Sequence, residues 1–125
     1  MKTYVGEFEE IVLLTVASLG EKAYGLDIIK EIESRTQRAV SVGALYNTIT
    51  RLTEKKYLRP RLTAPTHQRG GRRKNHFELT HQGKAAVLKT KQLRDLLWAI
   101  SKDKFLPDEM KYNPSSSIGK PADSC

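Results

Sequence analysis

A glycine-glycine-arginine-arginine-lysine run at residues 70–74 holds the densest group of side chains that could do chemistry. Three adjacent cations on a backbone freed by Gly70 and Gly71 suit the binding of a polyanion. Between Ala39 and Thr80 nine basic residues stand against two acidic ones, so this segment holds most of the net charge of +8. A nucleic acid bound there would release counterions, which favours binding. A basic run can equally be a merely solvated surface, so charge alone leaves both interpretations open.

A second group of polar residues lies on a helix predicted from Val42 to Lys55, with Ser41 as its N-cap. At 100° per residue the apolar side chains gather on one side. They are Val42, Leu45, Ile49 and Leu52. The opposite side is formed by Gly43, Ala44, Asn47, Thr50 and Arg51. Small residues allow close approach to a major groove, asparagine pairs with adenine, and arginine forks onto guanine or phosphate. A solvated helix face has the same pattern, and only the neighbouring basic loop favours recognition.

Two helices are predicted before this one. Apolar residues at three- and four-residue spacings predict a helix over Glu7–Leu19, which Gly20 ends as a C-terminal cap. A second helix is predicted over Gly25–Ser34, with Tyr24 packed on the first helix. Its apolar side is formed by Leu26, Ile29 and Ile32. The short polar link to the third helix makes the second and third helices a helix-turn-helix.

Two strand-like runs follow, Tyr57–Leu62 and Asn75–Leu79, joined by a projecting loop over Thr63–Lys74. Alternation predicts an inner and an outer face for each strand. The inner residues are Leu58, Leu62, Phe77 and Leu79, and the outer ones are Tyr57, Arg59, Arg61, His76 and Glu78. Pro60 cannot donate to a ladder, so the first strand is expected to lie at an edge or to break there.

A long last helix is predicted over His81–Lys102, with Thr80 as its cap. Its apolar stripe consists of Ala86, Leu93, Leu97 and Ile100, widened by Leu96 and Trp98. A helix of this length exceeds what so small a domain needs, so its spare apolar surface is best covered by a second copy. From Pro107 onward the composition predicts disorder.

The sequence offers little for catalysis, metal binding or a membrane. His67, His76 and His81 lack the spacing of metal ligands, and no cofactor motif is present. No apolar run is long enough to span a bilayer, and no secretory signal is recognisable. The single cysteine, Cys125, cannot form an internal disulfide, so we expect a cytoplasmic protein. The fold is predicted to be mainly α with a small β-hairpin. It comprises a winged helix-turn-helix domain over residues 1–80, a dimerisation helix over 81–106 and a disordered tail over 107–125.

Three groups of residues occur in order with regular gaps. They are Tyr24-Gly25-Leu26-Asp27-Ile28; Gly43-Ala44-Leu45-Tyr46 with Arg51-Leu52; and Gly70-Gly71-Arg72-Arg73-Lys74 with Phe77, Leu79-Thr80 and Gly83. Together they resemble the PadR family of winged-helix transcriptional regulators over about Gly6–Ile100. The resemblance implies a homodimeric, mostly repressing protein that binds double-stranded DNA at a palindromic operator. It also implies that the third helix enters the major groove, the wing tip meets the backbone or minor groove, and the last helix forms the dimer.

The resemblance also suggests which residues bind DNA. The helix contacts would be Ser41, Gly43, Tyr46, Asn47 and Arg51, and the wing contacts Gly70, Gly71, Arg72, Arg73 and Lys74. For Tyr46, a hydroxyl that reaches phosphate and a ring that simply packs are both open. Short members of the family resemble this chain in size, and some bind a flat aromatic effector between subunits. Trp98 could serve that purpose here, or it could be dimer packing.

One departure from the family concerns the end of the third helix. The family usually has glycine where Lys56 stands, and a left-handed lysine would cost about 1 kcal/mol, so the local turn is expected to differ. An alternative function is a winged-helix module that binds protein without DNA specificity. Such modules tend to have a neutral or acidic wing, and the basic wing here argues against one.

Overall fold

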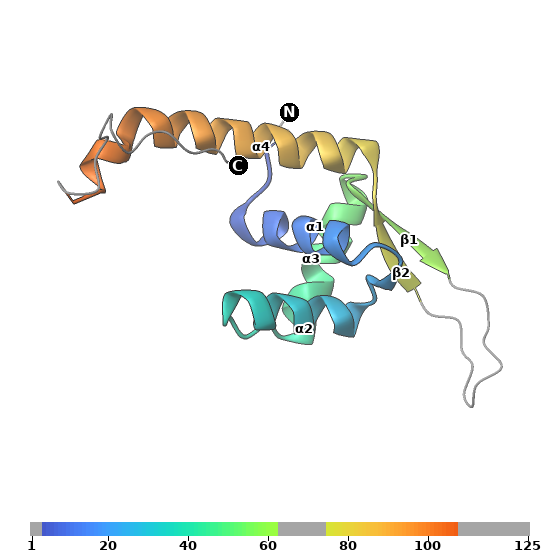
Figure 1. The fold of residues 1–125 in the computed structure, drawn as a ribbon. Helices are drawn as coiled ribbons and strands as arrows, with labels where there is room; N and C mark the ends of the chain where they lie inside the picture. The colour runs from blue at the N-terminus through green and yellow to red at the C-terminus, as the bar shows by residue number, and fades with distance from the viewer. Residues whose placement is uncertain (1–3, 63–74, 108–125) are drawn as a thin grey trace. The chain divides into compact units, whose positions relative to one another are not determined.

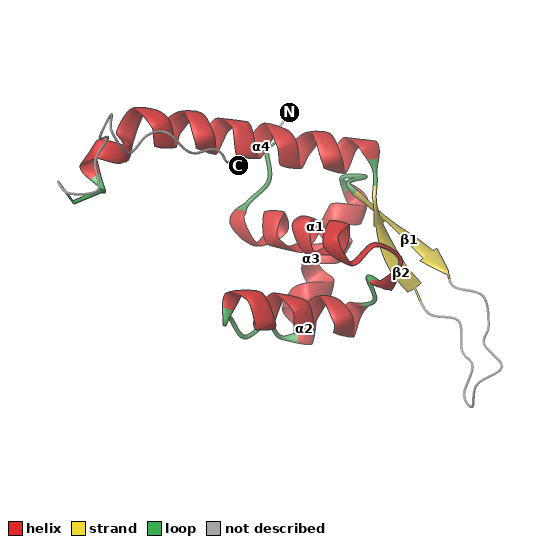
Figure 2. Ribbon diagram, viewed as in Figure 1, coloured by secondary structure: helices red, strands yellow, loops and turns green. Residues whose placement is uncertain are grey.

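The computed structural model describes residues 4–62 and 75–107. Its elements in chain order are α1 (Glu7–Leu19), η1 (Gly20–Lys22), α2 (Gly25–Thr36), α3 (Val42–Glu54), β1 (Leu58–Leu62), β2 (Asn75–Leu79), α4 (His81–Ser101) and η2 (Lys102–Lys104) (Figure 1). Helices dominate, and the two strands form one antiparallel hairpin, yellow in Figure 2. The predicted mainly α fold with a small β-hairpin is confirmed.

The core lies where α1, α2 and α3 meet, and the hairpin closes one side of it. Its largest fully buried side chains are Leu13, Ile28, Ile32, Leu45, Leu52, Leu58, Val12 and Val16. Each helix therefore contributes one apolar stripe, as an amphipathic helix on a small core does. The caps agree with prediction, because Ser41 Oγ accepts the Ala44 amide at 3.0 Å and Thr80 Oγ1 accepts that of Gly83 at 3.0 Å.

Three residues predicted to be buried are exposed. Leu26 is 65%, Val42 55% and Leu62 60% accessible. Leu26 and Val42 lie in the first turns of α2 and α3, and Leu62 is the last residue of β1. Periodicity predicts the direction of a side chain around its axis but not how far along that axis a neighbour covers it. These three side chains at the ends of their elements therefore point in the predicted direction, but no neighbouring element covers them.

Two residues that were absent from a predicted apolar side, or predicted to point outward, are buried. Ile28, absent from the predicted apolar side of the second helix, is fully buried in α2, and Tyr57, predicted on the outer face, is 9% accessible. Tyr57 precedes β1 and belongs to the turn after α3, so strand alternation does not apply to it. Tyr24 packs its ring edge-on to His76, 5.8 Å between centroids. Tyr24 therefore contacts the hairpin, and its predicted packing on the first helix stays a prediction.

The hairpin explains how Pro60 fits into a strand. Pro60 lies opposite Phe77 in the antiparallel register. The Phe77 amide donates to the carbonyl oxygen of Ala23 at 3.0 Å, on the side of β2 away from β1. Pro60 and Phe77 are therefore a non-hydrogen-bonded pair, and the missing amide of Pro60 removes no ladder bond. An isolated antiparallel bridge between Tyr24 and His76 lies next to this Phe77–Ala23 bond, on the same side of β2.

The junction between α3, β2 and α4 is held by short-range contacts. Lys56 has φ 66°, so the chain keeps a left-handed turn with lysine where the family has glycine. Thr80 Oγ1 donates to the Lys56 carbonyl at 2.6 Å, and the Thr80 amide donates to that of Tyr57 at 3.1 Å. The expectation of a different local turn was wrong, because these bonds hold the left-handed conformation. Gln37, after α2, is left-handed as well, at φ 59°.

The chain divides into two compact units, residues 1–91 and 92–125, which part within α4. In the first unit, Thr90 Oγ1 is buried, donates to the Ala86 carbonyl at 2.8 Å and accepts the Val5 amide at 3.1 Å. In the second unit, Trp98 stacks on Phe105. The limits predicted for the domains stay predictions, and the predicted tail lies almost wholly outside the described residues. None of the helices described has the length and apolar character that a membrane crossing requires.

Candidate nucleic-acid interface

The predicted outer side of α3 is exposed. Gly43, Ala44, Asn47 and Thr50 are all accessible, whereas Leu45, Thr48, Ile49 and Leu52 hold the helix in the core. A Cβ built on Gly43 would meet no atom within 4 Å, so nothing in the described chain covers the start of the helix. Thr50 donates its hydroxyl to the Tyr46 carbonyl at 2.9 Å. The Asn47 amide is therefore the main side-chain group that this face offers to a base edge.

Tyr46 lies across the amino end of α2. A Cβ at Gly25 would overlap the Tyr46 hydroxyl and approach its ring, so only glycine lets this ring lie against the α2 backbone. Tyr46 is still 44% exposed. Of the two possibilities left open for Tyr46, packing against the start of α2 is observed, and a contact of the hydroxyl with phosphate stays a prediction.

A pocket of about 470 Å³ lies beside Tyr46. Its lining is Tyr24, Gly25, Leu26, Asp27, Lys30, Tyr46, Asn75 and Phe77. Tyr24, the N-cap residue, makes no side-chain bond to the first amides of α2. The amino end of α2, with its positive helix dipole, therefore lines the pocket together with Tyr46 of α3 and Asn75, the first residue of β2.

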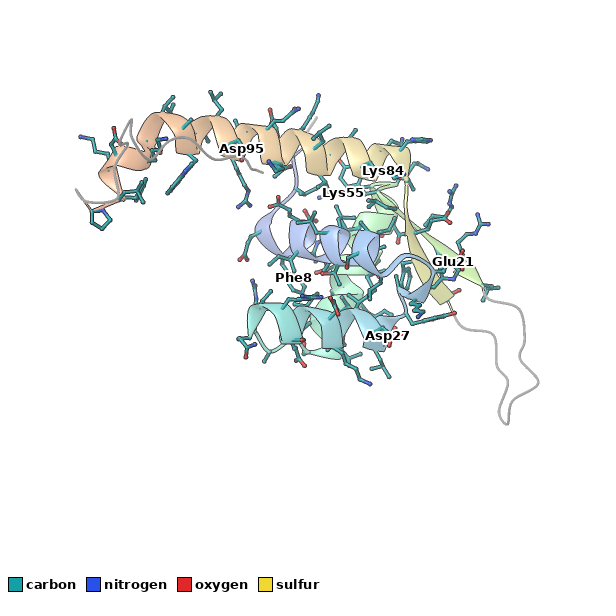
Figure 3. All side chains as sticks on the ribbon, viewed as in Figure 1. Phe8, Glu21, Asp27, Lys55, Lys84 and Asp95 are labelled. Atoms are coloured by element: carbon teal, nitrogen blue, oxygen red, sulfur yellow. The ribbon has the colours of Figure 1, made fainter. Side chains whose placement is uncertain are left out.

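Arg51 is exposed like Asn47, but two of its nitrogens have partners within the chain. Its Nη2 donates to Thr48 Oγ1 at 3.2 Å, and its Nε lies 3.6 Å from Glu9 Oε2. Lys55, labelled in Figure 3, donates to the same Glu9 carboxylate at 3.0 and 3.3 Å. Two of the cations counted towards a basic surface are thus engaged by α1.

The arginines of β1 are engaged in a similar way. Arg59 Nε and Nη2 donate to Glu78 Oε1 at 3.0 and 2.8 Å, and Arg61 Nη1 lies 3.6 Å from the same oxygen. The bond from Arg59 is the main reason why the pKa of Glu78 lies below its usual value of 4.5. Gly70, Gly71, Arg72, Arg73 and Lys74 lie outside the described residues. Four cations of the basic segment, Arg51, Lys55, Arg59 and Arg61, thus have acidic partners within the described residues. The cations at residues 72–74 are left as the main candidates for binding a polyanion.

Comparison with known proteins decides the family. A sequence model of the PadR-like family of transcriptional regulators matches residues 13–89. The chain belongs to the PadR-like family. It is therefore related to transcription factors and not to enzymes, and DNA-binding regulation is the function that the family implies. No curated protein sequence matches significantly.

Solved structures agree with a PadR-like winged helix. A PadR-like transcriptional regulator from Bacillus cereus has a TM-score of 0.66 and 18% identity, covering 81% of this chain and 93% of its own. A PadR family regulator from Clostridium difficile has a TM-score of 0.64 and 22% identity, covering 80% of this chain and all of its own. At these identities the likeness shows the fold alone.

Two residues of this PadR-like chain lie beside the predicted site without having been predicted there. Thr48 is buried on α3 and receives Arg51, and Asn75 lines the pocket beside Tyr46. Thr48 could have been found from the sequence, because it lies among the apolar positions of α3 and a buried hydroxyl needs a hydrogen-bond partner. No local signal existed for Asn75, because its place depends on how the hairpin returns to α2.

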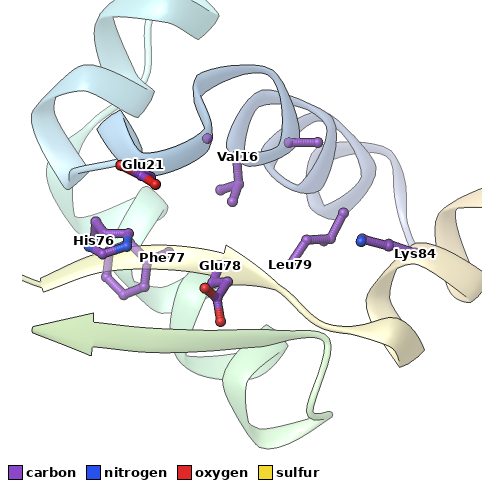
Figure 4. A pocket seen from close by; sticks show the side chains of 9 residues that line it. Val16, Glu21, His76, Phe77, Glu78, Leu79 and Lys84 are labelled. Atoms are coloured by element: carbon purple, nitrogen blue, oxygen red, sulfur yellow. The ribbon is translucent and has the colours of Figure 1, made fainter.

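Another pocket of the PadR-like chain, about 280 Å³, lies between the end of α1 and β2 (Figure 4). Its lining is Val16, Ala17, Gly20, Glu21, His76, Phe77, Glu78, Leu79 and Lys84. His76 was predicted to point outward and is half-buried, and its Nδ1 has no hydrogen-bond partner in the described part of the chain. Within that part no three His, Cys, Asp or Glu side chains lie where one metal ion could bind.

Trp98, the candidate effector residue, is 50% exposed in the second unit. Its ring stacks on Phe105, 6.0 Å between centroids and 16° from parallel. Leu93, Leu96, Leu97 and Ile100 recur on α4 at helical spacing, and the last three are exposed. Among the described residues the predicted stripe is therefore exposed only in part, at Leu96, Leu97 and Ile100, whereas Ala86 is buried in the core.

Proposed function

We propose that this PadR-like protein is a sequence-specific DNA-binding regulator that reads the major groove with α3. One observation supports this most: Gly43, Ala44 and Asn47 form an open, small-residue face on a helix whose other side is packed in the core. Gly43 and Ala44 allow the α3 backbone to approach, Asn47 pairs with an adenine edge, and Ser41, at the helix start, lies near the phosphates.

Tyr46 and the amino end of α2 bind the phosphate backbone beside α3. The Tyr46 hydroxyl donates to a phosphate oxygen, and the dipole at the start of α2 favours the same anion. Lys30 lines the pocket between them and adds a cation. Gly70 to Lys74 form the wing contacts, in which the two glycines allow close approach and Arg72, Arg73 and Lys74 meet the minor groove or phosphates.

The protein acts as a homodimer on a palindromic operator. The apolar positions of α4 between Leu93 and Ile100 are those of a helix that packs against a partner helix. A second copy covers them and places two α3 helices about one helical turn of DNA apart. The protein represses, works in the cytoplasm and is released by a small flat aromatic effector that inserts beside Trp98 and Phe105.

The test of DNA binding is selection of duplexes from a random pool, followed by titration at several salt concentrations. We expect a palindromic sequence bound with a steep salt dependence. Asn47→Ala should relax base preference, and Arg72→Ala with Arg73→Ala should weaken all sequences alike. Salt-independent binding, or no enrichment of any sequence, would contradict the proposal.

The dimer and the effector have separate tests. Sedimentation equilibrium should find two chains per particle, and Leu97→Glu should shift the population to single chains by placing a charge in the apolar stripe. Fluorescence of Trp98, the single tryptophan, should be quenched by a flat aromatic ligand that also releases the duplex. A panel of such compounds without any quenching would contradict the effector site.

A further inference from the structure

Glu9 is largely buried, which is unusual for a carboxylate in the first turn of a helix. Its side chain is 12% exposed, although it lies in the first turn of α1. One oxygen accepts the Gly6 amide at 3.0 Å and so caps α1. The other faces α3, with Lys55 Nζ at 3.0 Å and Arg51 Nε at 3.6 Å. A single carboxylate therefore joins the start of α1 to the last turns of α3.

We propose that Arg51 is a positioning residue, which acts on DNA binding through Glu9 and does not itself contact DNA. This inference rests on the proposed function, because it concerns how α3 is held for recognition. Glu9 and Arg51 together fix the position of α3 on α1, and the DNA-facing groups of α3 are thereby set in place.

The contacts of the guanidinium support this assignment. Arg51 Nη2 donates to Thr48, which is 2% exposed, and Nε faces Glu9. Two of its nitrogens thus face Thr48 and the Glu9 carboxylate of α1, although 54% of the Arg51 side chain is exposed. A guanidinium that forks onto guanine or phosphate needs its donors turned to the ligand. If Arg51 turned these two nitrogens to DNA, Glu9 would keep only the Gly6 amide and Lys55 as partners.

The two possible roles of Arg51 predict opposite effects for Glu9→Gln. This substitution keeps an oxygen for the Gly6 amide and removes the charge that holds Arg51. If Arg51 bound DNA directly, releasing it and removing a negative charge would leave affinity unchanged or higher. If Arg51 positions α3, Glu9→Gln loosens the helix and lowers affinity. We expect a loss of about fivefold, the equivalent of one weakened base contact.

The salt dependence of DNA binding provides a second test of whether Arg51 positions α3 or contacts DNA directly. When a cation that pairs with a phosphate is removed, the slope of log affinity against log salt becomes shallower by about 0.9. Arg51→Gln should lower affinity about fivefold with the slope of the wild type, since an indirect role involves no phosphate. Arg35→Gln is the matched control, because it removes the same charge from an exposed arginine that pairs with Glu31 on α2. Glu21→Gln, on η1, is the matched control for Glu9→Gln.

The experiment measures affinity for one selected duplex well below the unfolding temperature, so that every variant is folded. Circular dichroism verifies this. The double variant Glu9→Gln with Arg51→Gln should bind no more weakly than either single variant, because both remove one interaction. A slope reduced by about 0.9 in Arg51→Gln, or unchanged or tighter binding by Glu9→Gln, would overturn the inference.

Failure of this inference differs from failure of the proposed function. If the wild-type protein bound no duplex, the proposed function would fall. The coupling free energy between Glu9 and Arg51 could then still be measured by a double-mutant cycle of unfolding free energies. Additive effects of the two substitutions on unfolding would show that the pair does not hold α3, and would overturn the inference independently of DNA.

Discussion

Gly83 lies against the carbonyl oxygen of Tyr57 so closely that a Cβ at Gly83 would overlap that oxygen. Gly83 is in the first turn of α4, and Tyr57 ends the turn after α3. Since the obstructing atom belongs to the backbone, no side-chain rotation relieves the overlap. The contact allows α4 to begin directly over the end of α3, and it explains why the Leu79-Thr80 motif continues to a glycine.

Gly83→Ala should therefore lower the free energy of unfolding by about 1–3 kcal/mol, in spite of the better helix propensity of alanine. Urea denaturation measures this change. Gly43→Ala is the matched control, since a Cβ there meets nothing. It should raise stability by about 0.5–1 kcal/mol and yet weaken DNA binding, because the α3 backbone can no longer approach as closely. Equal effects of the two substitutions on stability would contradict the packing argument.

Gly25→Ala should displace Tyr46, because the new methyl group would take the place of the hydroxyl. We expect a loss of about 1–2 kcal/mol in unfolding free energy. In a Tyr46→Ala background the same substitution should cost little, since the obstructing ring is absent. Thermal unfolding of the four proteins of this cycle measures the coupling. A cost that persists in the Tyr46→Ala background would place the conflict elsewhere.

Lys56→Gly should stabilise the fold. Lys56 has φ 66°, which costs a residue with a Cβ about 1–2 kcal/mol, partly offset by the greater entropy that glycine loses on folding. The net gain should be about 0.5–1 kcal/mol. Lys56→Ala, which keeps the Cβ and removes the ammonium group, should give no such gain. If Lys56→Ala stabilised the protein as much as Lys56→Gly, the gain would come from removing the positive charge and not from relieving the left-handed backbone conformation.

The stability of the protein should fall in acid in part because of Glu9. Burial by itself raises the pKa of Glu9, but the Gly6 amide, Lys55 and Arg51 together lower it below 4.5. A lowered pKa in the folded state means that the ionised carboxylate contributes stability above its unfolded pKa. That contribution is lost as the pH falls through the folded pKa. Because Arg51 and Lys55 are about half exposed, the effect should stay below about 1 kcal/mol.

Comparison of wild type with Glu9→Gln between pH 7 and pH 3 tests this point. The stability difference between the two proteins should be largest near neutral pH and should shrink in acid. A difference that grew on acidification would mean that the folded-state pKa of Glu9 is raised.

The sequence by itself determined the features that depend on a few neighbouring residues. Ser41 and Thr80 were predicted as caps because a hydroxyl just before a helix reaches the next free amides. Gly20 was predicted to end α1, and its φ of 60° is the conformation that glycine allows most readily. The ordered motifs sufficed to predict the family. These features are local because capping bonds and helical periodicity act within about four residues.

Only the tertiary structure decided which distant residues meet. Arg51 has the angle of an outward residue on α3, and the structure places its Nε 3.6 Å from the Glu9 carboxylate, which comes from α1. Val42 has the angle of a core residue, yet no element covers the first turn of α3. The path of the chain brings such partners together or leaves them apart, and spacing within one helix has no information about that path.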